Sequence, residues 1–173
     1  YLQHYRKIGV KKIFIEAEVD ELYPDSFIDL RTWLGAKLMT TPEMDVQSAI
    51  AEFMRGFYGA AAEPMTRYLN CLEERMKEEK RPLSKAFVPT RKFLDKRFFE
   101  ETGAMLDEAE KAIADDPRRL LNVQQERLVI DIACLNIFKP HDPAVLKRMQ
   151  ENLDRFGEKY FAPSYWKNSV RNH

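Results

Sequence analysis

One short apolar run near the start of the chain limits the possible folds more than any other feature. Residues 10–16, within "GVKKIFIEAE", place Val10, Ile13, Phe14 and Ile15 close together without polar alternation. This pattern is typical of a parallel strand that is covered on both faces. A lone strand leaves both edges unpaired, and each buried backbone group without a partner costs about 1–3 kcal/mol. The run therefore predicts neighbouring strands.

The remaining sequence is helical in pattern almost throughout. The apolar run at 128–138 fits a helix better than a strand by its length. The simplest interpretation is that the chain is the C-terminal piece of a larger α/β protein, whose other strands lie on other sequence. The alternative is a mainly helical protein in which residues 10–16 form a short strand or pair between chains.

Cap residues and apolar spacing predict where the helices begin and end. We expect helices over 1–8, from 27 to about 39, from 46 to about 55, over about 61–79, from 96 to about 114, over 117–138 and from 143 to about 156. The predicted N-caps are Ser26, Asp45, Asp95, Asp116 and Asp142, and the predicted terminating glycines are Gly9, Gly56 and Gly157. The stretch "RGFYGAAAE" (55–63) predicts a structural corner, because its two glycines permit positive φ.

Composition excludes several classes of partner. The chain has 28 Lys and Arg against 28 Asp and Glu, so we predict no nucleic-acid partner. No apolar run reaches the roughly 20 residues that a membrane span needs. Cys71 and Cys134 lack metal-ligand spacing and are interpreted as thiols in the core, and the histidines His4, His141 and His173 are scattered. We therefore predict no metal site and no cofactor.

The order of motifs in the first 138 residues resembles a bacterial glycoside hydrolase family that was first catalogued as a domain of unknown function. The family pattern is a strand ending in Phe-Glu, a Leu-Ala-Lys-Leu helix, a proline followed by an acidic residue, a Glu-Phe helix, a Gly-Tyr-Tyr-Gly turn and an Arg-Tyr-Leu helix. In this sequence the corresponding residues are Ile15-Glu16, 34–38 with Gly35 inserted, 42–43, 52–53, 56–59 with Phe57 in place of the first tyrosine, and 67–69. Residues 93–138 look like the helical extension that follows.

The resemblance implies a mainly α fold. Residues 1–41 would be the last helix-strand-helix unit of a (β/α)8 barrel, and 42–173 an α-helical C-terminal domain. Family members are implied to come from Bacteroidetes, to carry an α-glucuronidase-like N-terminal module and, in some cases, to be endo-β-N-acetylglucosaminidases that cut N-glycans. The intact protein would then be a periplasmic, cell-surface or secreted glycosidase. We expect this chain alone to be inactive and mainly structural, with the barrel and a glycan as its partners.

The expected substrate contacts are Glu16, Glu18 and Tyr23, because barrel chemistry occurs at the C-terminal ends of strands. Glu16 ends the predicted strand, and Tyr23 could stack on a sugar. The two glutamates at i and i+2 do not form a convincing catalytic pair, so no catalytic residue is assigned. For each of these three residues a structural or solvated role stays open as the alternative.

Other candidate residues have a simpler structural interpretation. Trp33 is expected in the core or an interface, and Tyr58 in the corner. Asp131 is expected to form an ion pair with Arg127, one helical turn earlier. These features, together with the many amphipathic helices, support a second hypothesis in which the chain is a non-enzymatic helical binding or scaffolding module.

Overall fold

The computed structural model describes residues 2–13, 25–79 and 92–160, and these residues are mainly helical. Seven α-helices and one 3₁₀-helix lie in these ranges: α1 Leu2–Lys7, α2 Ile28–Thr40, α3 Val46–Tyr58, η1 Gly59–Ala61, α4 Ala62–Glu78, α5 Lys96–Ala112, α6 Pro117–Ile137 and α7 Pro143–Tyr160. None of these helices is long and apolar enough to cross a bilayer. The prediction of a mainly helical protein is confirmed.

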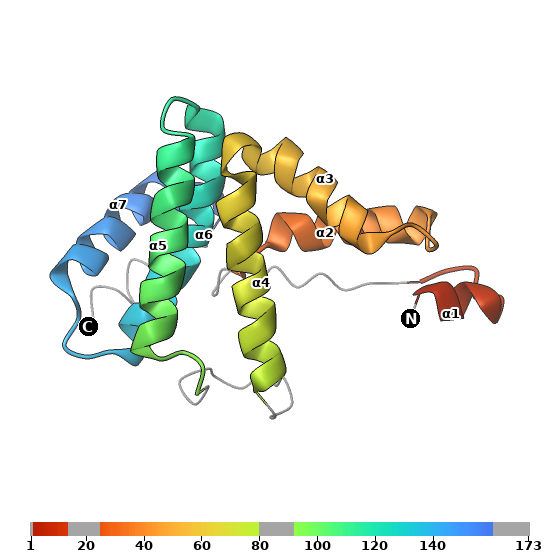
Figure 1. The fold of residues 1–173 in the computed structure, drawn as a ribbon, viewed down its shortest axis with the longest axis horizontal. Helices are drawn as coiled ribbons and strands as arrows, with labels where there is room; N and C mark the ends of the chain where they lie inside the picture. Colours follow the sequence, from red (N-terminus) through yellow and green to blue (C-terminus); the bar gives the residue numbers. More distant parts are fainter. Residues whose placement is uncertain (1, 14–24, 80–91, 161–173) are drawn as a thin grey trace.

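The helices α4, α5 and α6 form the body of the fold and lie side by side in Figure 1. Helix α7 packs against α6, and α3 packs against α4 and α6. Helix α2 packs on α3, so α2 and α3 extend from one end of the body (Figure 1). The short helix α1 lies beyond them and contacts the loop after α2, where Gln3 donates to the Pro42 carbonyl at 2.9 Å and Arg6 pairs with Glu43 at 2.7 Å.

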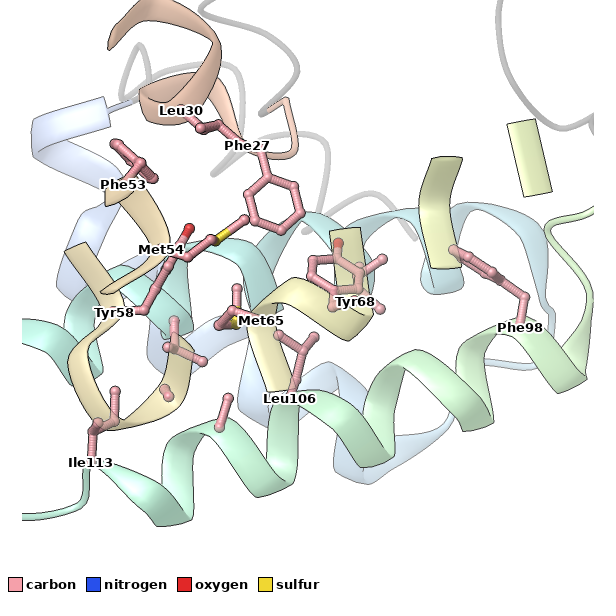
Figure 2. Packing of buried hydrophobic residues seen from close by; sticks show 14 residues of the cluster. Phe27, Leu30, Phe53, Met54, Tyr58, Met65, Tyr68, Phe98, Leu106 and Ile113 are labelled. Carbon is pink, nitrogen blue, oxygen red and sulfur yellow. The ribbon is translucent and has the colours of Figure 1, made fainter. Parts of the chain in front are cut away.

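One apolar cluster joins α3, α4, α5 and α6 (Figure 2). Its largest members are aromatic or sulfur-containing, and Phe27 enters it from the turn before α2 (Figure 2). A second, smaller cluster lies between α6 and α7 and includes Leu128 and Met149. As predicted, α6 has more buried residues than any other described helix.

Three of the predicted caps hold their helices as expected. The carboxylates of Asp45, Asp95 and Asp116 each accept a hydrogen bond from the backbone N–H three residues later. Pro117 follows Asp116 in the first turn of α6. Proline fits there because the first backbone N–H groups of a helix have no acceptor within the helix. Asp142 also accepts from the first turn of α7.

The predicted corner is confirmed, but its position shifts by one turn. Helix α3 continues through Gly56 and ends at Tyr58, and Gly59 takes the positive φ of 59° with ψ −122°. Packing explains the shift, because Asn122 of α6 donates to the Phe57 carbonyl and the Arg119 side chain lies against Gly59. Likewise, α7 does not end at Gly157 but runs to Tyr160.

The expected strand is not found in its described part. Residues 10–13 form no strand, and Val10 and Ile13 are exposed. No described segment lies beside them as a strand that could pair with their backbone. Residues 14–16 lie outside the described residues, and the division at residue 41 stays a prediction.

Candidate functional site

The three residues predicted to contact sugar, Glu16, Glu18 and Tyr23, lie outside the residues that the structure describes. Their role therefore stays a prediction. Within 2–13, 25–79 and 92–160, no three His, Cys, Asp or Glu residues are grouped so that they could hold a metal ion. Both cysteines are free thiols and half-buried.

A buried polar cluster joins the start of α2 to the helical body, and we call it the Glu126 joint. It consists of Ser26, Phe27, Tyr58, Tyr68 and Glu126. The backbone N–H of Phe27 donates to Glu126 Oε1 at 2.8 Å, across 99 positions of sequence. The Ser26 and Tyr68 hydroxyls lie 3.2 Å apart and share a hydrogen bond. The joint thus connects the turn before α2 with α4 and α6.

Phe27 replaces Ser26 as the N-cap of α2, which corrects the sequence prediction. Its backbone is left-handed, with φ 53° and ψ 36°. A bulky residue takes this conformation only when its surroundings favour it. Here the N–H is bound by Glu126, and the ring packs 5.2 Å from Tyr68 and 6.3 Å from Tyr58 between centroids. Ser26 is not available as the cap because its hydroxyl contacts Tyr68.

The carboxyl of Glu126 is buried, and the residue is only 3% exposed. Its second oxygen, Oε2, has no hydrogen-bond partner among the described residues. Burial raises the pKa of Glu126 to about 8; Asp29 raises it further, and the Phe27 N–H opposes the rise. The carboxyl is therefore mostly neutral at pH 7.

The two tyrosines of the joint are equally enclosed. Burial, and secondarily the charge of Glu126, raises the pKa of Tyr58 and of Tyr68 well above the usual value for a phenol. Neither phenol ionises in the neutral range. The interpretation of Tyr58 as part of a structural corner is confirmed, since it is buried between α3 and its neighbours.

Trp33 also has the structural role that its position predicted. Its ring packs against Phe53 of α3 at 5.4 Å between centroids, and the Lys37 ammonium lies 4.2 Å from the ring centroid. Lys37 is fixed in turn by Glu52 at 2.7 Å. These contacts occupy the ring and connect α2 to α3.

The predicted pair of Arg127 with Asp131 is wrong. Arg127 is buried and instead contacts α5, donating to Asp107 at 2.6 Å, to Glu110 at 3.0 Å and to the Gly103 carbonyl. Asp131 accepts two hydrogen bonds from Arg148 of α7, from Nη2 at 2.6 Å and from Nε at 2.8 Å. Each residue therefore joins α6 to a different neighbouring helix.

These features indicate what the Glu126 joint can do chemically. A neutral carboxyl with one unpartnered oxygen can gain or lose a proton, but its burial keeps substrate away from it. Its observed contact is structural, since it holds one backbone N–H in place. The arrangement therefore supports a positioning role for Glu126 in the described conformation.

The sequence carried a signal for Glu126 that pattern analysis did not use. Glu126 lies three residues after Val123 and four before Ile130, on the stripe of α6 that is buried. An acidic residue at such a position predicts a buried carboxyl. Its partner could not be found in this way, because Phe27 lies in a turn far away in sequence.

Comparison with known proteins places only the first part of the chain. No curated protein and no solved structure matches it significantly. Residues 1–70 match the model of a family described as a domain of unknown function (DUF4838). The match extends from α1 into α4, and so it includes four members of the Glu126 joint but not Glu126 itself.

Proposed function

We propose that this chain is the C-terminal portion of a glycoside hydrolase that acts on complex glycans such as N-glycans. In this proposal the helical body is mainly structural, and residues near the N-terminus contribute at most contacts to the substrate. The remaining barrel of the same polypeptide is the main partner, and the intact protein works in the periplasm, at the cell surface or outside the cell.

One observation carries the proposal: none of the described residues 2–13 is buried and four large apolar side chains there are exposed, whereas the helical body has a buried apolar core and only scattered exposed apolar residues such as Met76 and Leu121. Tyr5, Ile8, Val10 and Ile13 are all exposed, with Ile8 at 61%. Burying a side chain of this kind contributes about 1.5–3 kcal/mol. A barrel unit placed beside its neighbours would cover these side chains, as the resemblance to a hydrolase implies.

The position of the family match also supports the proposal. The match covers residues 1–70, which include α1, α2, α3 and part of α4. A family that includes both the exposed segment and the start of the helical body is consistent with one protein in which the two are joined. Its description assigns no activity.

The test compares substitutions in the intact parent protein and in this chain. Ile8→Lys should leave the isolated chain folded, because Ile8 is exposed there. In the parent it should abolish glycan release from N-glycoproteins, because the charge would enter a covered site. Met76→Lys is the matched control, since Met76 is an exposed apolar residue of α4, and it should be harmless in both proteins.

Two outcomes would contradict the proposal. If Ile8→Lys leaves the parent fully active, the segment is not covered by a barrel. If the folded parent releases no sugar from any glycoprotein, the hydrolase assignment fails, and the alternative of a binding or scaffolding module gains support. If the parent is active, Glu16→Gln tests the predicted substrate contact. Normal turnover by this variant would refute that contact.

A further inference from the structure

The turn before α2 is held to the helical body by very few groups. Helix α2 packs mainly on α3. Its start reaches the body through the side chains of Phe27 and Leu30 and through three hydrogen bonds: Phe27 to Glu126, Ser26 with Tyr68, and Gln125 to Asp29. Because Phe27 is left-handed, the turn is strained, and that strain persists only while the contacts hold it. Loss of the Glu126 contact would favour opening of this turn.

The charge state of Glu126 decides whether that contact is favourable. A neutral carboxyl can accept the Phe27 N–H inside the apolar cluster at little cost. An ionised carboxylate would be buried with one oxygen that has no described hydrogen-bond partner, and burying an unpaired charge is strongly unfavourable. Opening the turn would expose the carboxylate to water and remove this cost.

The surrounding titratable groups do not compensate such a charge. Those that face Glu126 from the turn, α2, α3 and α4 are Asp25, Asp29, Arg31, Tyr58 and Tyr68. Arg31 is the one cation of this set, and its guanidinium pairs with Asp25 at 2.5 Å in an exposed position. Asp29 adds negative charge, and both phenols remain neutral.

We propose that Glu126 is a proton-operated latch: the neutral carboxyl holds the Phe27 turn on the helical body, and loss of the proton releases the turn together with the start of α2. The latch controls how firmly the start of α2 is attached to α4 and α6. This inference rests on the described residues alone and does not require the hydrolase assignment.

Linkage gives the expected size of the effect. Opening exposes Glu126, whose pKa then returns from about 8 to the ordinary 4.5. Between these two values the open form binds one proton fewer than the closed form, so the opening equilibrium rises about tenfold per pH unit. The turn should therefore loosen as the pH rises from about 5 to 8 and change little above 8.

Hydrogen exchange on the full chain tests the latch. Protection factors for peptides that cover 27–34 would be measured by mass spectrometry between about pH 5.5 and 7.5, corrected for the intrinsic pH dependence of exchange. Protection in the native chain should fall about 100-fold over this range. In Glu126→Gln, which cannot ionise, it should stay constant.

Peptides from α5 provide the internal control. Their protection should exceed that of 27–34 at every pH, because the latch opens without unfolding the body. If the 27–34 and α5 peptides have the same protection at every pH, residues 27–34 exchange only through global unfolding, and the latch does not exist. Constant protection of 27–34 in the native chain would also overturn it.

A second variant keeps the test valid if Glu126→Gln fails to fold. Asp29→Asn removes a negative charge that raises the pKa of Glu126, and Asp29 is exposed and accepts a hydrogen bond from Gln125 at 3.5 Å. In this variant the loss of protection should level off at a lower pH than in the native chain. An unchanged pH profile would contradict the proposed role of Glu126.

Discussion

Replacing Glu126 with glutamine should change how the stability of the whole fold depends on pH. The glutamine retains an acceptor for the Phe27 N–H and stays neutral at every pH. Its amide group occupies the position of Oε2, which has no partner among the described residues. The substitution therefore changes the free energy of unfolding by an amount that does not vary with pH. The difference in unfolding free energy between the two proteins therefore isolates the proton on Glu126.

The magnitude follows from the two pKa values. Below pH 4.5 Glu126 is protonated in both the folded and the unfolded chain, so its ionisation has no effect. Between 4.5 and about 8 the unfolded chain loses the proton and the native chain keeps it, so the stability falls as the pH rises. Each pH unit in this range lowers the free energy of unfolding by about 1.4 kcal/mol. From pH 4.5 to 7 the native chain should lose about 3 kcal/mol relative to Glu126→Gln.

Urea unfolding followed by far-UV circular dichroism measures this difference at a series of pH values. All other titrating groups contribute equally to both proteins, so the subtraction removes them to a good approximation. The native chain should lose stability steadily relative to the variant and then level off above about pH 8. A difference that stays constant within about 0.5 kcal/mol would show that Glu126 is ionised and hydrated in the folded protein, which would refute the reasoning.

Two further contrasts test the corner and the ion pairs. Gly59→Ala should destabilise the fold by about 1–3 kcal/mol, because its backbone conformation disfavours a side chain and the new Cβ would lie 2.7 Å from the Arg119 side chain. Gly56 is exposed inside α3 and has open space around it, so Gly56→Ala should stabilise the fold by up to about 1 kcal/mol. Equal effects in thermal unfolding would contradict the assignment of the corner to Gly59. Arg148→Ala should cost about 3–5 kcal/mol, because it leaves Asp131, whose side chain is 2% exposed, charged without its partner. Asp107→Ala should cost at most about 1 kcal/mol, since the Asp107 side chain is 73% exposed and the buried Arg127 keeps its ion pair with Glu110. The reverse order in urea unfolding would contradict these burial assignments.

Local signals in the sequence were sufficient for most helix boundaries. Asp45, Asp95 and Asp116 each cap a helix through a bond to the N–H three residues later. Such a bond depends only on neighbouring residues, and so the amino-acid sequence alone predicts it. The free thiols and the positive φ in the 55–63 corner followed from equally local considerations.

Interactions between distant segments could not be predicted in this way. Arg127 and Asp131 are correctly spaced for a pair along α6, yet each binds a different helix, because long side chains reach across a helix interface as easily as along one turn. Similarly, the apolar run at 10–16 indicated a buried strand, whereas its described part is exposed. A sequence pattern gives the burial that a segment prefers but does not identify the surface that covers it.

The sequence by itself determined the helical character of this protein, the starts of its main helices and the need for glycine at the corner, because these depend on contacts within a few residues. Only the tertiary structure decided that Phe27 caps α2 in a left-handed conformation and that Glu126 holds it. The physical reason is that burial, which sets the proton affinity of Glu126, arises from α2, α3, α4 and α6 meeting at one point, and no single segment contains that information.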